Sequence, residues 1–148
     1  FSEKFGFIKM VYAEDLQQIW LLDESTKRLI QYNFREDKII NSYSFNIDFE
    51  NIKDVLIFNN EVYVLTKNHL SAYNFNGERI LELPLEQGRR LRRENGNILV
   101  MGTNSVHQLK NRSLQKIFSA ENSQIVDKNS VAYFVISANK LYLYPLNK

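Results

Sequence analysis

The sequence contains no cysteine and, in 148 residues, only two prolines and five glycines. The absence of cysteine excludes disulfide bonds, thiolate metal sites and a cysteine nucleophile. No apolar run approaches the roughly 20 residues that a membrane-spanning helix needs. A glycine-rich phosphate loop and a Gly-x-Ser-x-Gly nucleophile elbow are also absent. The sequence therefore predicts no cofactor and no catalytic centre, and we expect the protein not to be an enzyme.

Charge excludes a further class of partner. The formal net charge of the chain is only +2, which is too small to indicate a nucleic-acid-binding protein. Hydrophobic residues make up 44% of the chain and charged residues 24%, so the chain is expected to fold as one domain.

The stretch Glu61–Phe75, EVYVLTKNHLSAYNF, indicates the kind of structure. It contains two runs of apolar and aromatic residues, which are typical of β-strands. The polar residues 66–69 between the runs include an asparagine and are too few for a crossover helix. The stretch therefore predicts an antiparallel hairpin.

Copies of this hairpin recur along the chain. Apolar runs of four residues begin at positions 19, 62, 98 and 133, at steps of 43, 36 and 35 residues. The strand that follows each run repeats as well, with its anchors at Leu29, Leu70, Val106 and Leu141. Two markers that keep one period indicate a repeat architecture. A four-stranded unit repeated every ~35–43 residues predicts an all-β fold, namely a β-propeller or part of one.

The predicted blades span residues 7–45, 52–84, 89–119 and 123–147, and the last of them lacks a fourth strand. Residues 1–5 are expected to be the tail of a preceding blade or a closing strand. Two interpretations stay open. The chain could close a four-bladed ring, or it could be part of a larger ring whose other blades lie upstream or in another chain. The second is favoured because residues 1–5 leave little strand for closure.

The basic run of residues 89–93 is the sharpest local feature. Its arginines could bind a phosphate or an acidic partner, because a guanidinium makes bidentate contacts. The run lies on a predicted first strand, which would approach the central channel. The competing interpretation is that these are ordinary strand residues, split between two faces and neutralised by Glu82, Glu86 and Glu94. The predicted partner- or anion-binding residues are Arg89, Arg90, Arg92 and Arg93.

Other candidates are weaker. His69 and His107 flank equivalent anchors, but zinc needs three or four ligands and the sequence offers no third, so no metal site is predicted. Paired carboxylates can hydrolyse glycosides, but acids in turns more often accept backbone hydrogen bonds. Aromatic residues at repeat positions are expected to pack in the core or between blades. The acids are Glu14, Asp15, Asp23 and Glu24, and the aromatic residues are Trp20, Tyr32, Tyr63, Tyr73 and Tyr144.

The repeat unit, an apolar run such as IWLL or VYVL followed by a turn and then by LIQYNF or LSAYNF, resembles the degenerate repeats of NHL and quinoprotein-like propellers. It lacks the Trp-Asp and Gly-His signatures of WD repeats. Its residue usage resembles uncharacterised exported propellers of Bacteroidetes. This resemblance implies a location in the periplasm or cell envelope, and a role as an accessory subunit of outer-membrane complexes such as secretion channels.

Two functional hypotheses follow. The first is a non-catalytic interaction scaffold whose partners are proteins, such as an outer-membrane complex or the remaining blades of the propeller. No nucleic acid and no direct membrane span are expected. The alternative is a small-ligand-binding or hydrolytic propeller with its site at the mouth of the central channel, where side chains from several blades would have to converge.

Overall fold

The computed structural model describes residues 6–146. These residues form fifteen strands, and among them there is no helix of the length and apolar character needed to cross a membrane. Within each sheet every strand pairs with its neighbours in sequence, and all pairings are antiparallel. Three sheets have four strands and the last sheet has three. The predicted all-β fold with repeated antiparallel units is confirmed.

The bounds of the strands follow the repeat. The first sheet contains β1 (Ile8–Ala13), β2 (Gln18–Asp23), β3 (Arg28–Asn33) and β4 (Lys38–Ser44). The second contains β5 (Ile52–Phe58), β6 (Glu61–Thr66), β7 (His69–Tyr73) and β8 (Arg79–Pro84). The third contains β9 (Gly88–Glu94), β10 (Asn97–Gly102), β11 (Ser105–Lys110) and β12 (Ser113–Ser119). The fourth contains β13 (Ile125–Lys128), β14 (Ala132–Ser137) and β15 (Lys140–Pro145).

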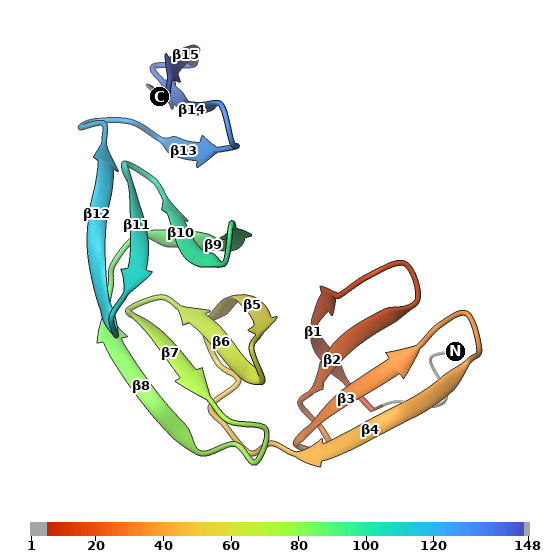
Figure 1. Ribbon diagram of the computed structural model, residues 1–148. Coiled ribbons are helices and arrows are strands. Elements are labelled where there is room, and N and C mark those ends of the chain that lie inside the picture. The colour runs from red at the N-terminus through yellow and green to blue at the C-terminus, as the bar shows by residue number, and fades with distance from the viewer. Residues whose placement is uncertain (1–5, 147–148) are drawn as a thin grey trace.

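The four sheets follow one another along an open arc (Figure 1). The fourth strands β4, β8 and β12 lie on its outer side, while β1 contacts β5 and β5 contacts β9 nearer its hollow side. The first and last sheets stand at opposite ends, so residues 6–146 do not themselves form a closed four-bladed ring. Residues 1–5, for which a closing strand or a blade tail was predicted, lie outside the described part of the chain.

Four of the hairpins turn through only two residues, both with positive φ. Asn59-Asn60 joins β5 to β6, and Asn95-Gly96 joins β9 to β10. Asn111-Arg112 and Ala138-Asn139 close the hairpins β11–β12 and β14–β15. Positive φ at both central residues is the mark of a type I′ turn, whose twist matches that of the strands. Asparagine tolerates this conformation, which explains its place at the tip of each of these hairpins.

The hydrophobic core is divided among the seams between sheets, because each second strand is covered on both faces. Val62 and Val64 of β6 pack in the seam with the first sheet, whereas Tyr63 and Leu65 pack in the seam with the third. β10 repeats this arrangement between the second and fourth sheets. A strand buried on both faces reads as a continuous apolar run. This is the physical origin of the repeated runs in the sequence.

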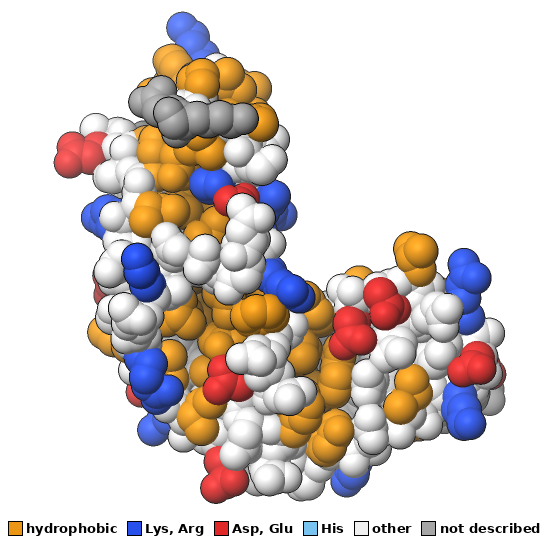
Figure 2. Space-filling view, in the orientation of Figure 1, with side chains coloured by type: hydrophobic (Ala, Val, Ile, Leu, Met, Phe, Trp, Pro, Cys, Tyr) orange, Lys and Arg blue, Asp and Glu red, His pale blue; other side chains and the backbone are white. Residues whose placement is uncertain are grey.

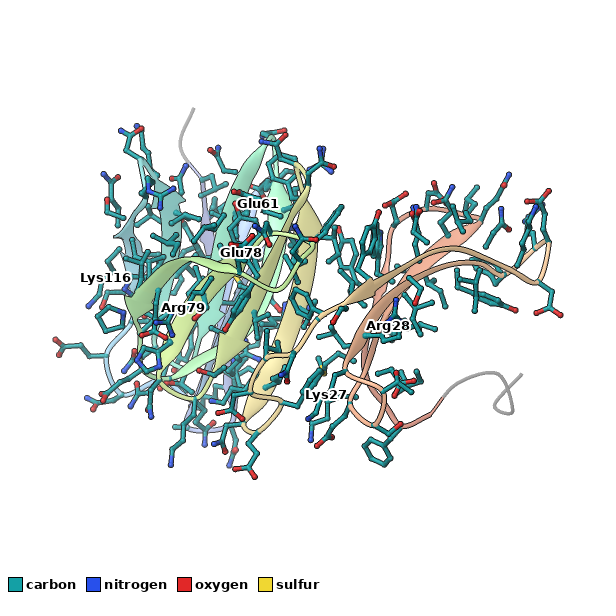
Figure 3. All side chains as sticks on the ribbon, turned by 90° about the horizontal axis from the view of Figure 1, so that it is seen from below. Lys27, Arg28, Glu61, Glu78, Arg79 and Lys116 are labelled. Carbon is teal, nitrogen blue, oxygen red and sulfur yellow. The ribbon has the colours of Figure 1, made fainter. Side chains whose placement is uncertain are left out.

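Charged side chains on the outside are dispersed rather than gathered. Lys27 projects from the β2–β3 turn, Glu78 and Arg79 from the start of β8, and Lys116 from β12 (Figure 3). Arg79 Nη1 lies 2.8 Å from Glu82 Oε2 on the same strand. Exposed pairs of this kind contribute little to stability, typically about 0–1 kcal/mol, so the seams hold the sheets together.

Candidate functional site

Two of the four predicted arginines hydrogen-bond from the third sheet to the backbone of the fourth. Arg89 donates from Nε to the carbonyl oxygen of Gly102 at 2.9 Å and from Nη2 to that of Val126 at 2.6 Å. Arg92 donates from Nη1 to the carbonyl oxygen of Lys128 at 2.6 Å. Burial lowers the pKa of Arg89, and the nearby Asp127 opposes this shift. The donors that an anion would use are therefore partly committed to the backbone of the neighbouring sheet.

The charges of the run are also compensated. Arg90 Nη2 lies 3.3 Å from Asp127 Oδ1, and Arg92 Nη2 lies 3.6 Å from Glu94 Oε2. The buried Lys128 ammonium pairs with the other oxygen of Glu94. Of the three glutamates expected to neutralise the run, Glu94 does so. Asp127, which the sequence interpretation did not include, supplies a second negative charge from β13.

Arg93 is placed differently from the other three arginines. Its guanidinium lies over the ring of Phe58, 4.3 Å from the ring centroid, and its side chain is exposed. It lines a cavity of about 480 Å³ between the first and second sheets, which we call the first cleft. Residues of both sheets form its walls, and Arg93 reaches it from the third sheet. The structure thus brings one predicted arginine into a cleft, whereas Arg89, Arg90 and Arg92 link the third sheet to the fourth.

The floor of the first cleft is aromatic. Trp20 is only 5% exposed, and its indole Nε1 donates to Glu14 Oε1 at 2.7 Å. Its ring centroid lies 5.1 Å from that of Phe75 and 6.3 Å from that of Tyr43. Tyr43 and Phe75 also contact each other, with 5.1 Å between centroids. Tilted and offset rings at these distances attract each other, so the floor is held in one arrangement.

The walls of the first cleft are polar. Asn41 Nδ2 donates to Gln31 Oε1 at 2.7 Å, and Gln31 Nε2 donates to Gln18 Oε1 at 2.6 Å. Asn59 and Asn60 add two exposed amides from the β5–β6 turn. Tyr12 closes the inner side, and burial raises the pKa of its hydroxyl, which Arg93 opposes and Glu14 reinforces. The cleft thus combines ring faces with amides fixed by their own hydrogen bonds.

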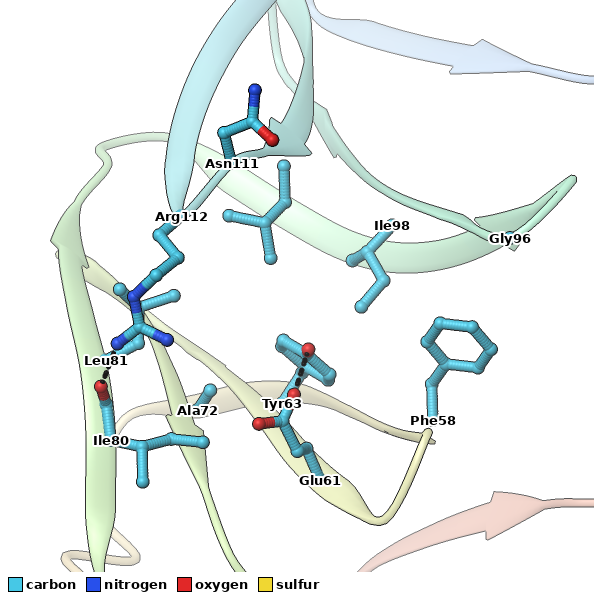
Figure 4. A pocket seen from close by; sticks show the side chains of 11 residues that line it. Phe58, Glu61, Tyr63, Ala72, Ile80, Leu81, Gly96, Ile98, Asn111 and Arg112 are labelled. Carbon is cyan, nitrogen blue, oxygen red and sulfur yellow. Dashed lines mark hydrogen bonds between the residues drawn. The ribbon is translucent and has the colours of Figure 1, made fainter.

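A second cleft of about 300 Å³ occupies the equivalent place between the second and third sheets (Figure 4). Tyr63 takes the position of Trp20 there, and its hydroxyl donates to Glu61 Oε1 at 2.7 Å. Burial and this hydrogen bond raise the pKa of Tyr63. Arg112 donates to the carbonyl oxygen of Ile80 at 2.6 Å. Apolar side chains form most of its remaining lining, including those of Phe58, Ala72, Leu81, Ile98 and Leu109.

The histidines do not come together in a metal site. His69 Nε2 lies 4.0 Å from Glu82 Oε1 on the outer part of the second sheet. His107 lies on β11, where burial lowers its pKa and Lys116 adds to this shift. Within residues 6–146, no group of three or more His, Asp or Glu side chains could hold a metal ion.

The carboxylates of the first sheet serve the backbone and Trp20. Asp15 Oδ1 accepts from the amides of Gln17 and Gln18, both at 2.8 Å. Asp23 accepts from the amides of Gly6 and Phe7 and from the Ser25 hydroxyl. Asp15 precedes β2 and Asp23 ends it, so these two acids stand at opposite ends of one strand. Trp20, Tyr32 and Tyr63 are buried as predicted, while Tyr144 is 45% exposed although its ring lies against Phe118.

Sequence reasoning missed the first cleft. Its residues come from three sheets, and no local motif joins Glu14, Asn60 and Arg93. A signal was nevertheless present, because the one tryptophan of the chain follows a turn that carries a glutamate. The equivalent tyrosine of the second repeat also follows a turn and a glutamate.

Comparison with known proteins supports the fold. No protein-family model matches the chain, and no curated protein matches it by sequence. Solved structures match over most of its length. BamB from Moraxella catarrhalis aligns over 95% of this chain and 43% of its own, with a TM-score of 0.56 and 11% identity. The WD40 domain of Neurospora crassa Pan2 aligns over 93% and 50%, with a TM-score of 0.53 and 13% identity.

A third similar structure is PorZ of Porphyromonas gingivalis, described as an essential bacterial surface component of the type-IX secretion system. It aligns over 95% of this chain and 21% of its own, with a TM-score of 0.51 and 12% identity. The chain therefore spans half or less of each of these structures. At such identities the likeness shows the fold alone, and the fold is that of a partial β-propeller.

Proposed function

We propose that the chain belongs to a non-catalytic protein-interaction scaffold, an accessory subunit of a protein complex of the bacterial cell envelope or periplasm, such as a secretion channel. The observation that carries this proposal is the uncovered apolar face of the fourth sheet. Leu141 is 67% exposed and Leu143 is 57% exposed. Figure 2 shows apolar side chains gathered at this end of the arc.

Pairing between strands places these side chains on one surface. Ile136 pairs with both Ile125 and Leu141, and Phe134 pairs with Leu143. Side chains directly opposite each other on neighbouring strands share a face. We call this surface the terminal face; its apolar members are Ile125, Phe134, Ile136, Leu141 and Leu143, and Asp127 lies on it opposite Phe134. Contiguous exposed apolar surface of this kind marks an interaction site.

The corresponding face of the second sheet shows what such a surface contacts. Leu56, Tyr63 and Leu65 form part of a buried cluster with Leu91 and Ile98 of the third sheet. Phe134 and Ile136 of the fourth sheet take the positions of Tyr63 and Leu65, whereas Asp127 takes that of Leu56. Apart from Asp127, the terminal face has the apolar character of the covered face. It is therefore suited to contact another β-sheet.

The edge of the fourth sheet adds a second means of attachment. A fourth strand pairs with β3, β7 and β11 in the other sheets, whereas β15 has no such partner among residues 6–146. An unpaired edge offers backbone donors and acceptors to a further strand, and strand addition is a common mode of protein recognition. The occupant we propose is a β-sheet of a partner protein, which would add a strand to β15 and cover the terminal face.

The envelope role draws support from the comparisons rather than from a site. One similar structure is BamB, and another is the surface component PorZ. The chain spans 43% and 21% of these proteins, so their partners are carried over here only as part of the proposal.

Photocrosslinking in bacterial cells that express the full-length protein tests the proposal. A photoreactive phenylalanine analogue would replace Leu143, with Leu16, which is 81% exposed in the β1–β2 loop, as the control position. We expect Leu143, and not Leu16, to give a crosslink to a separate envelope protein that mass spectrometry identifies. Crosslinks only within the same polypeptide would show that this face is an internal seam. Either that result or no crosslink from Leu143 would remove the basis for the proposal.

Ligand binding in the first cleft is the second candidate function, favoured by the aromatic and amide side chains that converge there. A hydrolytic role has less support, because Glu14, the acid of this cleft, accepts a hydrogen bond from Trp20.

A further inference from the structure

We infer that the first cleft binds an uncharged, hydroxyl-rich ligand of the carbohydrate class. This inference is independent of the scaffold proposal, because the first cleft and the terminal face are formed by different sheets. The volume of the first cleft, about 480 Å³, lies in the range of small-molecule sites, roughly 300–1,000 Å³.

The charges of the first cleft cancel. Glu14 and Arg93 are its two charged side chains and have opposite signs. Each also has a partner in the protein, since Glu14 accepts from Trp20 and Arg93 lies over the ring of Phe58. A charged ligand would therefore meet both an attractive and a repulsive group. A neutral ligand can use both groups as hydrogen-bond partners without an unpaired charge.

The amides of the first cleft match hydroxyl groups. An amide side chain offers two donors and an acceptor, and a hydroxyl group both donates and accepts. Gln31 and Asn41 are held in orientation by their chain of hydrogen bonds. Asn59 and Asn60 are exposed at the mouth, where the turn fixes their backbone with φ of 54° and 61°. Four amides around one cavity thus provide a recurring donor–acceptor pattern.

The rings of the first cleft match the apolar side of a sugar. Tyr12, Tyr43 and Phe75 are half-buried and line the cavity. Phe58 lines it as well, with one ring face covered by Arg93. A pyranose ring has C–H groups on one face and hydroxyl groups at its edge. Aromatic faces bury such C–H groups, while planar amides at the edge bond the hydroxyls.

A peptide fits this cleft less well than it fits the second cleft. A peptide anchors through one large apolar side chain in an apolar pocket, and apolar side chains form most of the lining of the second cleft. In the first cleft, amides and charged groups stand beside the rings. This difference between the seams favours a sugar in the first.

Trp20 gives a direct readout, because it is the one tryptophan of the chain and lies in the floor of the cleft. The full-length protein would be titrated with four neutral disaccharides, namely maltose, cellobiose, lactose and N,N′-diacetylchitobiose, while tryptophan emission is followed. Any further tryptophan in the full-length protein would be replaced by phenylalanine. We expect a saturable change with at least one sugar. An acidic and a neutral hexapeptide are titrated in the same way, to test a peptide as the alternative ligand.

Matched variants locate the binding. Asn60→Gly keeps a residue that accepts positive φ and removes an amide of the cleft, and Gln31→Ala removes another. Asn95→Gly makes the same change in the equivalent turn of the third sheet, outside the cleft. The loss of one neutral hydrogen bond should weaken sugar binding roughly three- to tenfold in the first two variants. Asn95→Gly should bind as the unmodified protein does.

Three results would overturn the inference. The first is unchanged emission with every disaccharide up to about 20 mM, well above a dissociation constant of about 1 mM. The second is an affinity for the sugar that is the same in Asn60→Gly, Gln31→Ala and Asn95→Gly. The third is a stronger response to either hexapeptide than to any sugar, which would make the cleft a peptide site.

Discussion

Replacement of Gly88 by alanine tests how tightly the second and third sheets are packed. Gly88 is the buried first residue of β9. A Cβ at this position would lie 3.0 Å from Leu65 Cδ1, 3.4 Å from Leu65 Cδ2 and 3.2 Å from Val100 Cγ1. Leu65 is 0% exposed and Val100 is 1% exposed. Since protein interiors are close-packed, neither side chain has free space into which it could turn.

The expected cost follows from these distances. Alanine should gain roughly 0.5–1 kcal/mol over glycine inside a strand because it loses less backbone entropy on folding. Overpacking of a dense core costs about 1–3 kcal/mol. The contacts at 3.0 and 3.2 Å are closer than the usual 3.5–4.0 Å of carbon pairs, so the steric term should dominate. We expect Gly88→Ala to lower the free energy of unfolding by about 1–2 kcal/mol.

Urea unfolding followed by circular dichroism measures this change, and a double-mutant cycle assigns it. Leu65→Val shortens the side chain by one methylene and so vacates the positions of Cδ1 and Cδ2, which lie nearest the new Cβ. The double variant should therefore be more stable than the sum of the single effects predicts, by at least about 0.5 kcal/mol. The packing argument for this seam would be refuted if Gly88→Ala were at least as stable as the unmodified protein. It would also be refuted if the effects of Gly88→Ala and Leu65→Val on stability were strictly additive.

Three further predictions concern the β14–β15 turn, the hydrogen bonds of Arg89 between sheets, and the carboxylate of Asp23. Ala138 has a φ of 51° in the β14–β15 turn, so Ala138→Asn should raise the free energy of unfolding by about 0.5–1 kcal/mol. An unchanged or lower thermal midpoint would contradict this. Arg89→Ala removes the donors to Gly102 and Val126 and should speed hydrogen exchange in β13 but not in β6. Equal protection of β13 in the variant and the unmodified protein would refute the role of this hydrogen bond between sheets. Burial would raise the pKa of Asp23, but hydrogen bonds from Gly6, Ser25 and Thr26 outweigh it and lower the pKa. Its stabilising effect is therefore present above the unfolded pKa of about 3.9 and is lost as the pH falls through the folded value. Asp23→Asn should show a weaker loss of stability in acid, and parallel pH profiles would contradict the role of this carboxylate.

The sequence by itself determined the repeat. The apolar runs of β2, β6 and β10 recur because each of these strands is buried on both faces. A strand buried on both faces needs apolar residues at successive positions, which can be recognised in the local sequence. The turn positions were predictable for a similar reason. Asn95-Gly96 and Asn59-Asn60 stand where the backbone needs positive φ, and few residue types adopt it at low cost.

The role of the arginine run could not be predicted in this way. Its strand was identified, but Arg89 and Arg92 bind carbonyl groups of Val126 and Lys128, which lie 37 and 36 positions further on. Such a contact depends on the distance and twist between two sheets, which no local pattern encodes. The sequence interpretation could only state that arginines on this strand would meet either an anion or neutralising acids.

Tertiary structure alone decided the first cleft and the open arc. Glu14, Asn60 and Arg93 become neighbours because turns of two sheets and a strand of a third meet at one seam. Leu141 and Leu143 of the terminal face are as apolar as residues of a covered face, and they are exposed because no further sheet of residues 6–146 lies against them. Local sequence fixes which residues share a face of a strand, whereas the packing of whole sheets decides what that face meets.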